Sequence, residues 1–227
     1  MDKDLSKGFH LLLEGEARTL GNFTDIGRYD AGVGLEYILN QHFQFSLCYK
    51  MIEKKNSSGE WKMRHRIYAD AKAALQAGDW NFSLRERLQL THKDVNPIKK
   101  QTTPNSLTLK SRLQAAYKGF LQSEPYAYIE LRNVFNDPAC SATWSTVSQT
   151  FSDYEFLGYN HAYVNRIRGS IGVEWELDKH NCFDFHILTD YCKDKEIDTA
   201  DNGTRLESLY WARTFYGAFC VGYTFSF

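Results

Sequence analysis

Hydrophobic and polar side chains alternate along most of this 227-residue chain, and this period of two is the feature that most limits its fold. In residues 43–51, every second side chain is large and apolar, from Phe43 to Met51. A β-strand places successive side chains on opposite faces, so the alternation predicts strands rather than helices. The same pattern recurs in residues 29–39 and 215–227. We therefore predict an all-β protein.

The spacing of the predicted strands indicates how they connect. Ten strands are expected, over residues 8–19, 28–39, 43–54, 61–76, 80–92, 107–118, 126–135, 163–177, 182–193 and 209–227. The intervening segments are alternately long and short, and both chain ends fall on the short side. An up-and-down antiparallel barrel, with tight turns at one rim and long loops at the other, has this layout. We expect residues 1–227 to form a single domain, a common length for such a barrel.

The two faces of the predicted strands suggest a membrane environment. One face of nearly every strand is apolar and the other is charged. A soluble barrel turns the apolar face inward, whereas a bilayer-spanning barrel turns it toward lipid. The strands reach the ~9–11 residues that a crossing needs, and aromatic residues such as Trp61, Trp80 and Trp175 lie near their ends, as interface girdles require. We expect a transmembrane barrel in contact with the lipid bilayer; a soluble ligand-binding barrel is the less favoured alternative.

The last strand ends in an alternating aromatic series, Tyr223, Phe225 and Phe227. This ending resembles the C-terminal assembly signal of Gram-negative outer-membrane barrels. The resemblance implies a bacterial outer-membrane location and the outer-membrane assembly machinery as a partner. Residues 1–4 contain no apolar core, so this location requires that a signal peptide has been removed; a cytoplasmic chain is the other interpretation of that segment.

Composition excludes several other classes. No apolar run approaches the ~18 residues of a membrane-spanning helix. The 27 Lys and Arg residues nearly balance the 28 Asp and Glu residues, so we expect no nucleic-acid partner. The five cysteines are odd in number and include no CxxC pair, which disfavours a disulfide framework.

Several short motifs link the chain to a known family. They are Arg64-His65-Arg66, LRERLQ at 84–89, LKSRL at 109–113, EPYAYIEL at 124–131 and NRIRGSIGV at 165–173. Together they resemble a family of Gram-negative outer-membrane β-barrels catalogued as a domain of unknown function, over about Tyr29 to Phe227. The resemblance implies architecture and location. It implies no activity, cofactor or catalytic residue.

The charged face predicts a polar network in the lumen. Its expected members are Arg64, Arg66, Asp70, Arg85, Arg87, Arg112, Glu130, Arg132, Arg166, Arg168, Glu174 and Glu176. Arginine forms planar, bidentate pairs with carboxylates, so this set can fill a narrow barrel. Ten strands also lie nearer to filled eight-stranded barrels than to open sixteen-stranded porins. We expect a largely occluded lumen; an anion-binding or anion-selective constriction is the alternative.

Other candidate sites are weaker. Cys182, Asp184 and His186 share one face, but their ~7 Å spacing along a strand is too long for one metal ion. We expect no metal and no cofactor. Glu86 falls on the apolar face, so we expect a bulge, a shallower depth or a shifted register there. The predicted loop 136–162 contains serines, acids and His161, which leaves an outer-membrane hydrolase as the alternative function.

The sequence thus predicts an integral outer-membrane barrel, structural or partner-binding, or else a narrow channel; an enzyme is less favoured. The predicted loop 136–162 is the expected binding surface for a protein partner or small ligand. It holds too many aromatic residues for a freely solvated segment, namely Trp144, Phe151, Tyr154, Phe156 and Tyr159, with Tyr163 directly after it. We expect these rings to cover the barrel mouth or to contact the partner.

Overall fold

The protein is a single antiparallel sheet in the computed structural model, which describes residues 2–6, 8–20, 24–56 and 58–225. Eleven strands pair in chain order. They are β1 Asp2–Ser6, β2 Phe9–Leu20, β3 Asp25–Ile38, β4 Phe43–Lys55, β5 Trp61–Ala77, β6 Trp80–Lys93, β7 Asn105–Tyr117, β8 Ser123–Ser145, β9 Thr150–Glu176, β10 Asn181–Ala200 and β11 Arg205–Phe225. A 3₁₀ turn, η1 (Pro97–Lys99), lies between β6 and β7.

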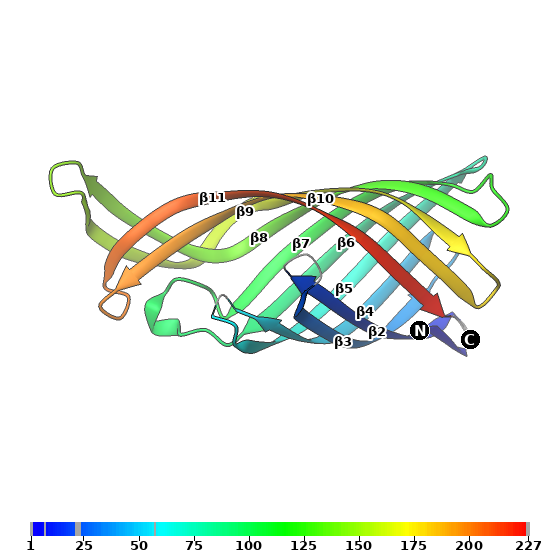
Figure 1. Ribbon diagram of the computed structural model, residues 1–227, viewed down its shortest axis with the longest axis horizontal. Coiled ribbons are helices and arrows are strands. Elements are labelled where there is room, and N and C mark those ends of the chain that lie inside the picture. The colour runs from blue at the N-terminus through cyan, green and yellow to red at the C-terminus, as the bar shows by residue number, and fades with distance from the viewer. Residues whose placement is uncertain (1, 7, 21–23, 57, 226–227) are drawn as a thin grey trace.

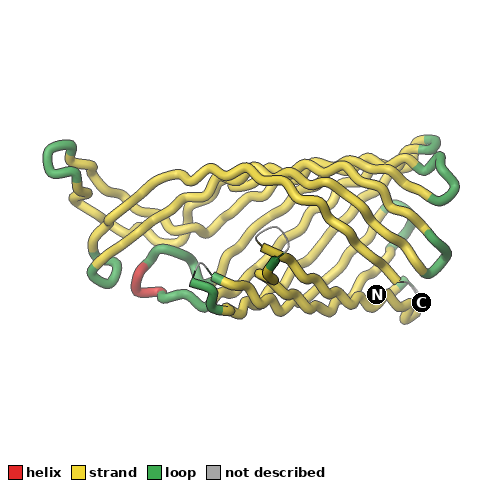
Figure 2. Tube along the Cα trace, viewed as in Figure 1, coloured by secondary structure: helices red, strands yellow, loops and turns green. Residues whose placement is uncertain are grey.

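The sheet curls about one long axis into an open barrel (Figure 1). Both chain ends lie at the rim that carries the short turns (Figure 1). Within the described residues, the ladders run from β1 to β11, and none joins β11 back to β1 or β2. Strands make up nearly all of the trace in Figure 2. No helix in the described part of the chain is long and apolar enough to cross a membrane. The predicted all-β, up-and-down antiparallel architecture is confirmed.

The alternation of the sequence becomes an inside and an outside of this barrel. Paired residues face the same side, as Leu47 and Leu35 do on the outside and Lys50 and Arg66 do on the inside. Leu47 is 59% exposed, whereas Cys48, the next residue, is buried. The large apolar side chains thus cover the outer surface, and the charged face lines the lumen.

Two predicted loops are wrong. Strands β8 and β9 continue through most of residues 136–162 and leave a turn only at 146–149. Likewise β10 and β11 shorten the predicted loop 194–208 to residues 201–204. The β8–β9 ladder shifts register at five places, between Arg132/Asn133 and Ser141/Thr143. Each such bulge interrupts the alternation of side chains between the two faces. The sequence of these segments therefore lacks the hydrophobic–polar pattern that predicts a strand. The short strand β1 was also not predicted.

The expectation for Glu86 is wrong as well. The ladders on both sides of β6 are regular, with Glu86 opposite Ala71 on β5 and Ser111 on β7. Neither a bulge nor a shifted register is present there, and Glu86 lies in the middle of its strand. Its side chain stays on the outer face, where it accepts a hydrogen bond from Ser111.

Candidate functional site

Glu130 is the centre of one ion-pair cluster in the lumen. Its carboxylate is 4% exposed and lies 2.9 Å from the guanidinium groups of both Arg85 and Arg112. The three residues come from β6, β7 and β8, which the alternation turns to the same side. Arg112 also stacks over the Tyr128 ring, 3.9 Å from its centroid. One buried carboxylate therefore holds two cations in place.

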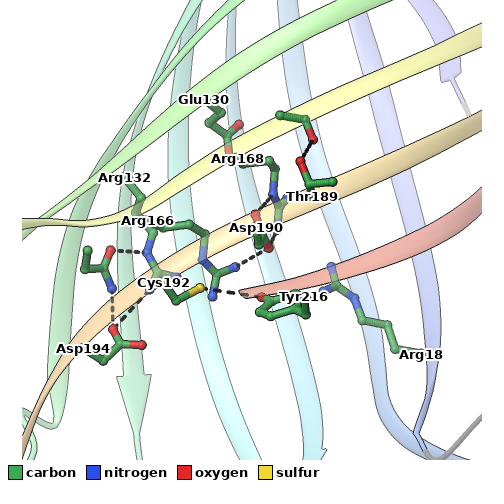
Figure 3. Close-up of polar contacts among 12 residues, drawn as sticks. Arg18, Glu130, Arg132, Arg166, Arg168, Thr189, Asp190, Cys192, Asp194 and Tyr216 are labelled. Atoms are coloured by element: carbon green, nitrogen blue, oxygen red, sulfur yellow. Dashed lines mark hydrogen bonds and ion pairs between the residues drawn. The ribbon is translucent and has the colours of Figure 1, made fainter. Parts of the chain in front are cut away.

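Asp190 forms a second cluster, on the neighbouring strands β9 and β10 (Figure 3). Its carboxylate is fully buried and accepts bonds of 2.8 and 2.9 Å from Arg168 and one of 3.4 Å from Arg166. Arg132 follows along the same wall and donates a 2.6 Å hydrogen bond to Asn165, which in turn donates to Asp194 at 2.8 Å. These contacts join β8, β9 and β10 on their inner face.

A third cluster crosses the lumen from β5 to β2. Arg87 forms a bidentate pair with Asp70, with bonds of 2.6 and 2.5 Å. The Arg87 guanidinium lies 3.9 Å from the centroid of the Tyr68 ring. The Tyr68 hydroxyl donates a 2.8 Å bond to Glu14 on β2, and Glu14 also pairs with Lys50. This cluster connects strands that are not neighbours in the sheet, so side chains occupy the space between the walls.

The remaining predicted lumen residues stand apart from these clusters. The Arg66 side chain donates only to Thr91, at 3.2 Å, and the Arg64 side chain makes no hydrogen bond or ion pair within the described residues. Glu174 and Glu176 lie toward the short turns, where Glu174 is opposite both Glu124 and Asp184. The predicted set therefore divides into a paired middle, a basic part toward the long connections and an acidic part toward the short turns.

The acidic part contains the Cys182, Asp184 and His186 series. Asp184 accepts a 2.7 Å bond from the Tyr126 hydroxyl and lies 2.9 Å from His186 Nδ1. In the part of the chain that the structure describes, no group of three or more His, Cys, Asp or Glu residues is arranged to hold a metal ion. The contacts of Asp184 in this series are thus those with the Tyr126 hydroxyl and the His186 ring.

A cavity of about 210 Å³ lies between the paired clusters and the short turns. Asp70, Arg85 and Arg112 contribute to its wall, together with Lys72 and Gln114. Members of two ion-pair clusters therefore border this space.

The long hairpins form a second candidate surface beyond the barrel. The β9–β10 ladder ends at Arg166 and Cys192, and beyond it the β8–β9 and β10–β11 hairpins separate (Figure 1). Tyr163 packs edge-on against Trp211 where they part, with ring centroids 5.0 Å apart. Tyr163 also donates a 3.0 Å bond to Asp137, whose carboxyl pKa is raised by burial.

The η1 segment connects to both hairpins. Thr199 on β10 donates a 2.5 Å bond to the Lys99 carbonyl, and the Lys100 ammonium lies 5.3 Å from the centroid of the Phe156 ring on β9. The aromatic residues of the predicted loop thus lie on an extended hairpin. Trp144 and Phe151 pack edge-on against each other there, with ring centroids 4.8 Å apart.

The serines and His161 of this outer surface contact other partners in the described part of the chain. Ser152 donates a 3.0 Å bond to the adjacent Asp153, while His161 packs against Tyr163 and Trp211. Within the described residues, no hydrogen bond joins His161 to a serine hydroxyl. Hydrogen-bond contact between a nucleophile and its base is the usual sign of a hydrolase site.

Several network members were missing from the sequence prediction, chiefly Asp190, Glu14 and Lys50. The alternation did contain a signal for Asp190, because it shares the inward face of its strand with Asp184 and His186. Which cation each acid contacts depends on the register between strands, which one strand's pattern does not specify.

Comparison with known proteins gives one family match. The sequence model of a family described as "Protein of unknown function (DUF2490)" matches residues 1–201. No curated protein matches the chain. Among solved structures, the ferric yersiniabactin uptake receptor FyuA from Yersinia pestis is similar at 10% identity, with a TM-score of 0.36 over 98% of this chain and 40% of that one. The copper transporter OprC is similar at 8% identity, with a TM-score of 0.34 over 95% of this chain and 39% of that one. The chain spans about two fifths of both structures.

Proposed function

Since the chain belongs to the DUF2490 family, whose description assigns no activity, we propose a function from its own geometry. In this proposal, the protein is an integral outer-membrane β-barrel with a charged, largely occluded lumen. Its extended hairpins bind a partner outside the membrane. The observation that carries this proposal is the combination of an apolar exterior with buried ion pairs inside.

The exterior supports a bilayer location. Ile171 is 73% exposed and Phe215 is 71% exposed, and they belong to a continuous apolar face. Such a face in water is unfavourable by about 25 cal/mol per Å², and soluble monomers rarely present one. Aromatic pairs lie at both ends of the face: Tyr29 with Trp61 toward the long connections, and Trp80 with Tyr117 toward the short turns. Interface girdles have this arrangement.

The outer membrane is the membrane that suits an up-and-down barrel of this kind. A spanning barrel must satisfy every backbone group in the hydrocarbon region and therefore must close. We accordingly expect β11 to pair in the bilayer with the part of β2 beyond Phe9–Leu12, the stretch that pairs with β1. The terminal aromatic series supports the same location through its resemblance to an outer-membrane assembly signal.

Occlusion of the lumen is supported by contacts that pass over intervening strands. Arg85 on β6 reaches Glu130 on β8, and Tyr68 on β5 reaches Glu14 on β2. Buried pairs of this kind are costly to separate, so they favour a packed interior over a wide pore. A narrow anion-selective channel is the second candidate, because the outer half of the lumen carries cations without acidic partners.

Conductance in planar bilayers tests both candidates. We expect no steady porin-sized current from the unmodified protein. Replacing Arg66, Arg87 and Arg112 together by Ala should lower stability and start a leak if the lumen is packed. If the protein is instead a narrow channel, the same change should mainly remove its anion preference. A large, stable, cation-selective current from the unmodified protein would contradict both candidates.

A further inference from the structure

Cations stand side by side across four strands on the inner wall. Arg87, Lys110, Arg132 and Arg166 occupy one continuous line of register through β6, β7, β8 and β9. Residues directly opposite each other in a sheet have Cβ atoms ~4.5–5.5 Å apart, and like charges there are destabilising. Carboxylates pair with Arg87, Arg132 and Arg166. Within the described residues, Lys110 is therefore the member of this line whose charge has no direct partner.

The same opposition of like charges repeats nearer the long connections. Arg64 on β5 is directly opposite Lys93 on β6, and Arg66 is opposite Lys50 on β4. Lys54 is flanked by Arg28 on one side and Lys62 on the other. Lys54 and Lys93 lie at the ends of β4 and β6 that lead into the long connections. The positive region therefore continues to the mouth of the barrel.

Carboxylates act on these cations only from a distance, as Glu130 does on Lys110 and Asp137 does on Lys93. Within the described residues, the side chains of Lys54, Arg64, Lys93 and Lys110 form no hydrogen bond or ion pair, and the Arg66 side chain donates only to the Thr91 hydroxyl. By contrast, Arg85, Arg87, Arg112 and Arg168 in the adjacent clusters are all paired with carboxylates. Because the arginines of the adjacent clusters are paired with carboxylates, the unpaired cations are distinct from those clusters. Arg64, Arg66, Lys93 and Lys110 are also half-buried, so their charges converge in a sheltered space.

We propose that Lys54, Arg64, Arg66, Lys93 and Lys110 form a binding site for a phosphate-bearing polyanion that enters from the side of the long connections. The proposal rests on the barrel of the proposed function, whose lumen must open to that side. A phosphate group carries up to two charges and several acceptor oxygens, and arginine and lysine bind it as a planar fork and as a point charge. Several phosphates on one ligand would match cations on four adjacent strands, β4 to β7.

A thermal unfolding experiment on the purified full chain in neutral detergent tests the site. Sodium tripolyphosphate should raise Tm by about 5 °C or more at saturation, since a ligand that binds only the folded state stabilises it. Sodium chloride of equal ionic strength should give a smaller rise, because it only screens the repulsion. Adding phosphatidic acid to the micelles provides a second arm. A response to tripolyphosphate alone assigns the site to a free polyanion, whereas a response to phosphatidic acid alone assigns it to a lipid phosphate.

Substitutions separate a binding site from a structural one. Lys110→Met and Lys93→Met should each reduce the tripolyphosphate response severalfold without lowering Tm in its absence, because each removes a repelled cation. Lys72→Met is the matched control, since Lys72 faces the lumen near the short turns, and it should keep the full response. Equal responses to tripolyphosphate and chloride, or full responses from both variants, would overturn the site. Either result would leave the conductance test of the barrel unaffected, so the two proposals can fail separately.

Discussion

Ser111 Oγ donates a 2.6 Å hydrogen bond to Glu86 Oε2 on the outer surface of the barrel. The two residues are directly opposite each other on β6 and β7, and leucines lie two positions away on both strands. This is a polar pair within an apolar face. In lipid, the bond lowers the cost of a carboxyl group that water would otherwise solvate.

Replacing the pair by apolar residues should therefore stabilise the protein in a bilayer. The double variant Glu86→Leu/Ser111→Ala leaves neither partner unsatisfied, and we expect its free energy of unfolding in lipid vesicles to rise by about 1 kcal/mol. Glu53→Leu is the control, because Glu53 faces outward near the end of β4 and should change stability little. A loss of stability in the double variant would argue against lipid contact at this position.

Asp190 should be among the least replaceable residues of the lumen. Its fully buried carboxylate holds Arg168 and Arg166, so Asp190→Ala leaves two cations without their partner. We expect a loss of about 3–5 kcal/mol in the free energy of unfolding, measured by denaturant titration in detergent. Asp198→Ala on the same strand removes an exposed acid bonded to Ser208 and should cost much less. Similar losses for the two variants would contradict a central role for the buried cluster.

The sequence predicted the faces of the barrel but not the contacts within it. Alternation alone placed Arg85, Arg112 and Glu130 on the inner side, because the side-chain period of a strand is two. That Glu130 bridges both arginines depends on the relative register of β6, β7 and β8, for which the sequence holds no comparable signal. The β8–β9 extension was missed for a related reason: its bulges shift the pattern repeatedly, and Pro138 and Gly158 within it are typical of loops.

Gly203 should control how the η1 segment rests against the β10–β11 turn. It adopts φ +80°, and an added Cβ would overlap the Ile98 carbonyl oxygen. Gly203→Ala should therefore displace residues 97–100 and speed tryptic cleavage after Lys99 and Lys100 severalfold. Gly59→Ala is the matched control, because Gly59 has the same φ of +80° but open space around it. Equal cleavage rates for both variants would show that the faster cleavage is caused by backbone strain alone and not by the lost contact with η1.

The turn between β9 and β10 should lose protection in acid. Asp178 accepts a 2.8 Å bond from the His180 backbone N–H and a 2.9 Å bond from the Asn181 side chain, and these hydrogen bonds lower the carboxyl pKa. Because the carboxyl pKa is lower in the folded protein, the ionised Asp178 stabilises the turn at pH values above the unfolded pKa of ~3.9. This stabilisation is lost as the pH falls through the folded pKa.

Hydrogen exchange at residues 179–181, corrected for intrinsic rates, measures this effect. Protection should decline as the pH is lowered through that window in the unmodified protein and should be nearly constant in Asp178→Ala. Lys179→Ala, in the same turn, should retain the decline. An identical pH profile in Asp178→Ala would assign the acid sensitivity to another group.

The end of β11 should determine insertion into the membrane. The ladder with β10 is regular from the pair Asp198–Ser208 to the pair Asn181–Phe225. The centroid of the Tyr223 ring lies 5.1 Å from that of Phe183 at the short-turn rim. Phe227 lies outside the described residues. Because a barrel in lipid must leave no edge unpaired, the last strand has to be presented to the assembly machinery and then paired with the part of β2 that β1 leaves free.

Replacing Tyr223, Phe225 and Phe227 together by Ser should therefore reduce the inserted fraction severalfold in cells while total synthesis is unchanged. Replacing Phe215, Phe219 and Val221 by Ser is the matched control, since these residues share the outer face of the same strand but lie upstream of its end. This control removes a similar amount of apolar surface. It should therefore lower the stability of the inserted barrel more than it lowers recognition of the last strand by the assembly machinery. Fractionation of membranes, with heat-dependent gel migration as the sign of a folded barrel, distinguishes the two effects. Normal membrane levels of the terminal triple variant would show that these aromatic residues are not an assembly signal.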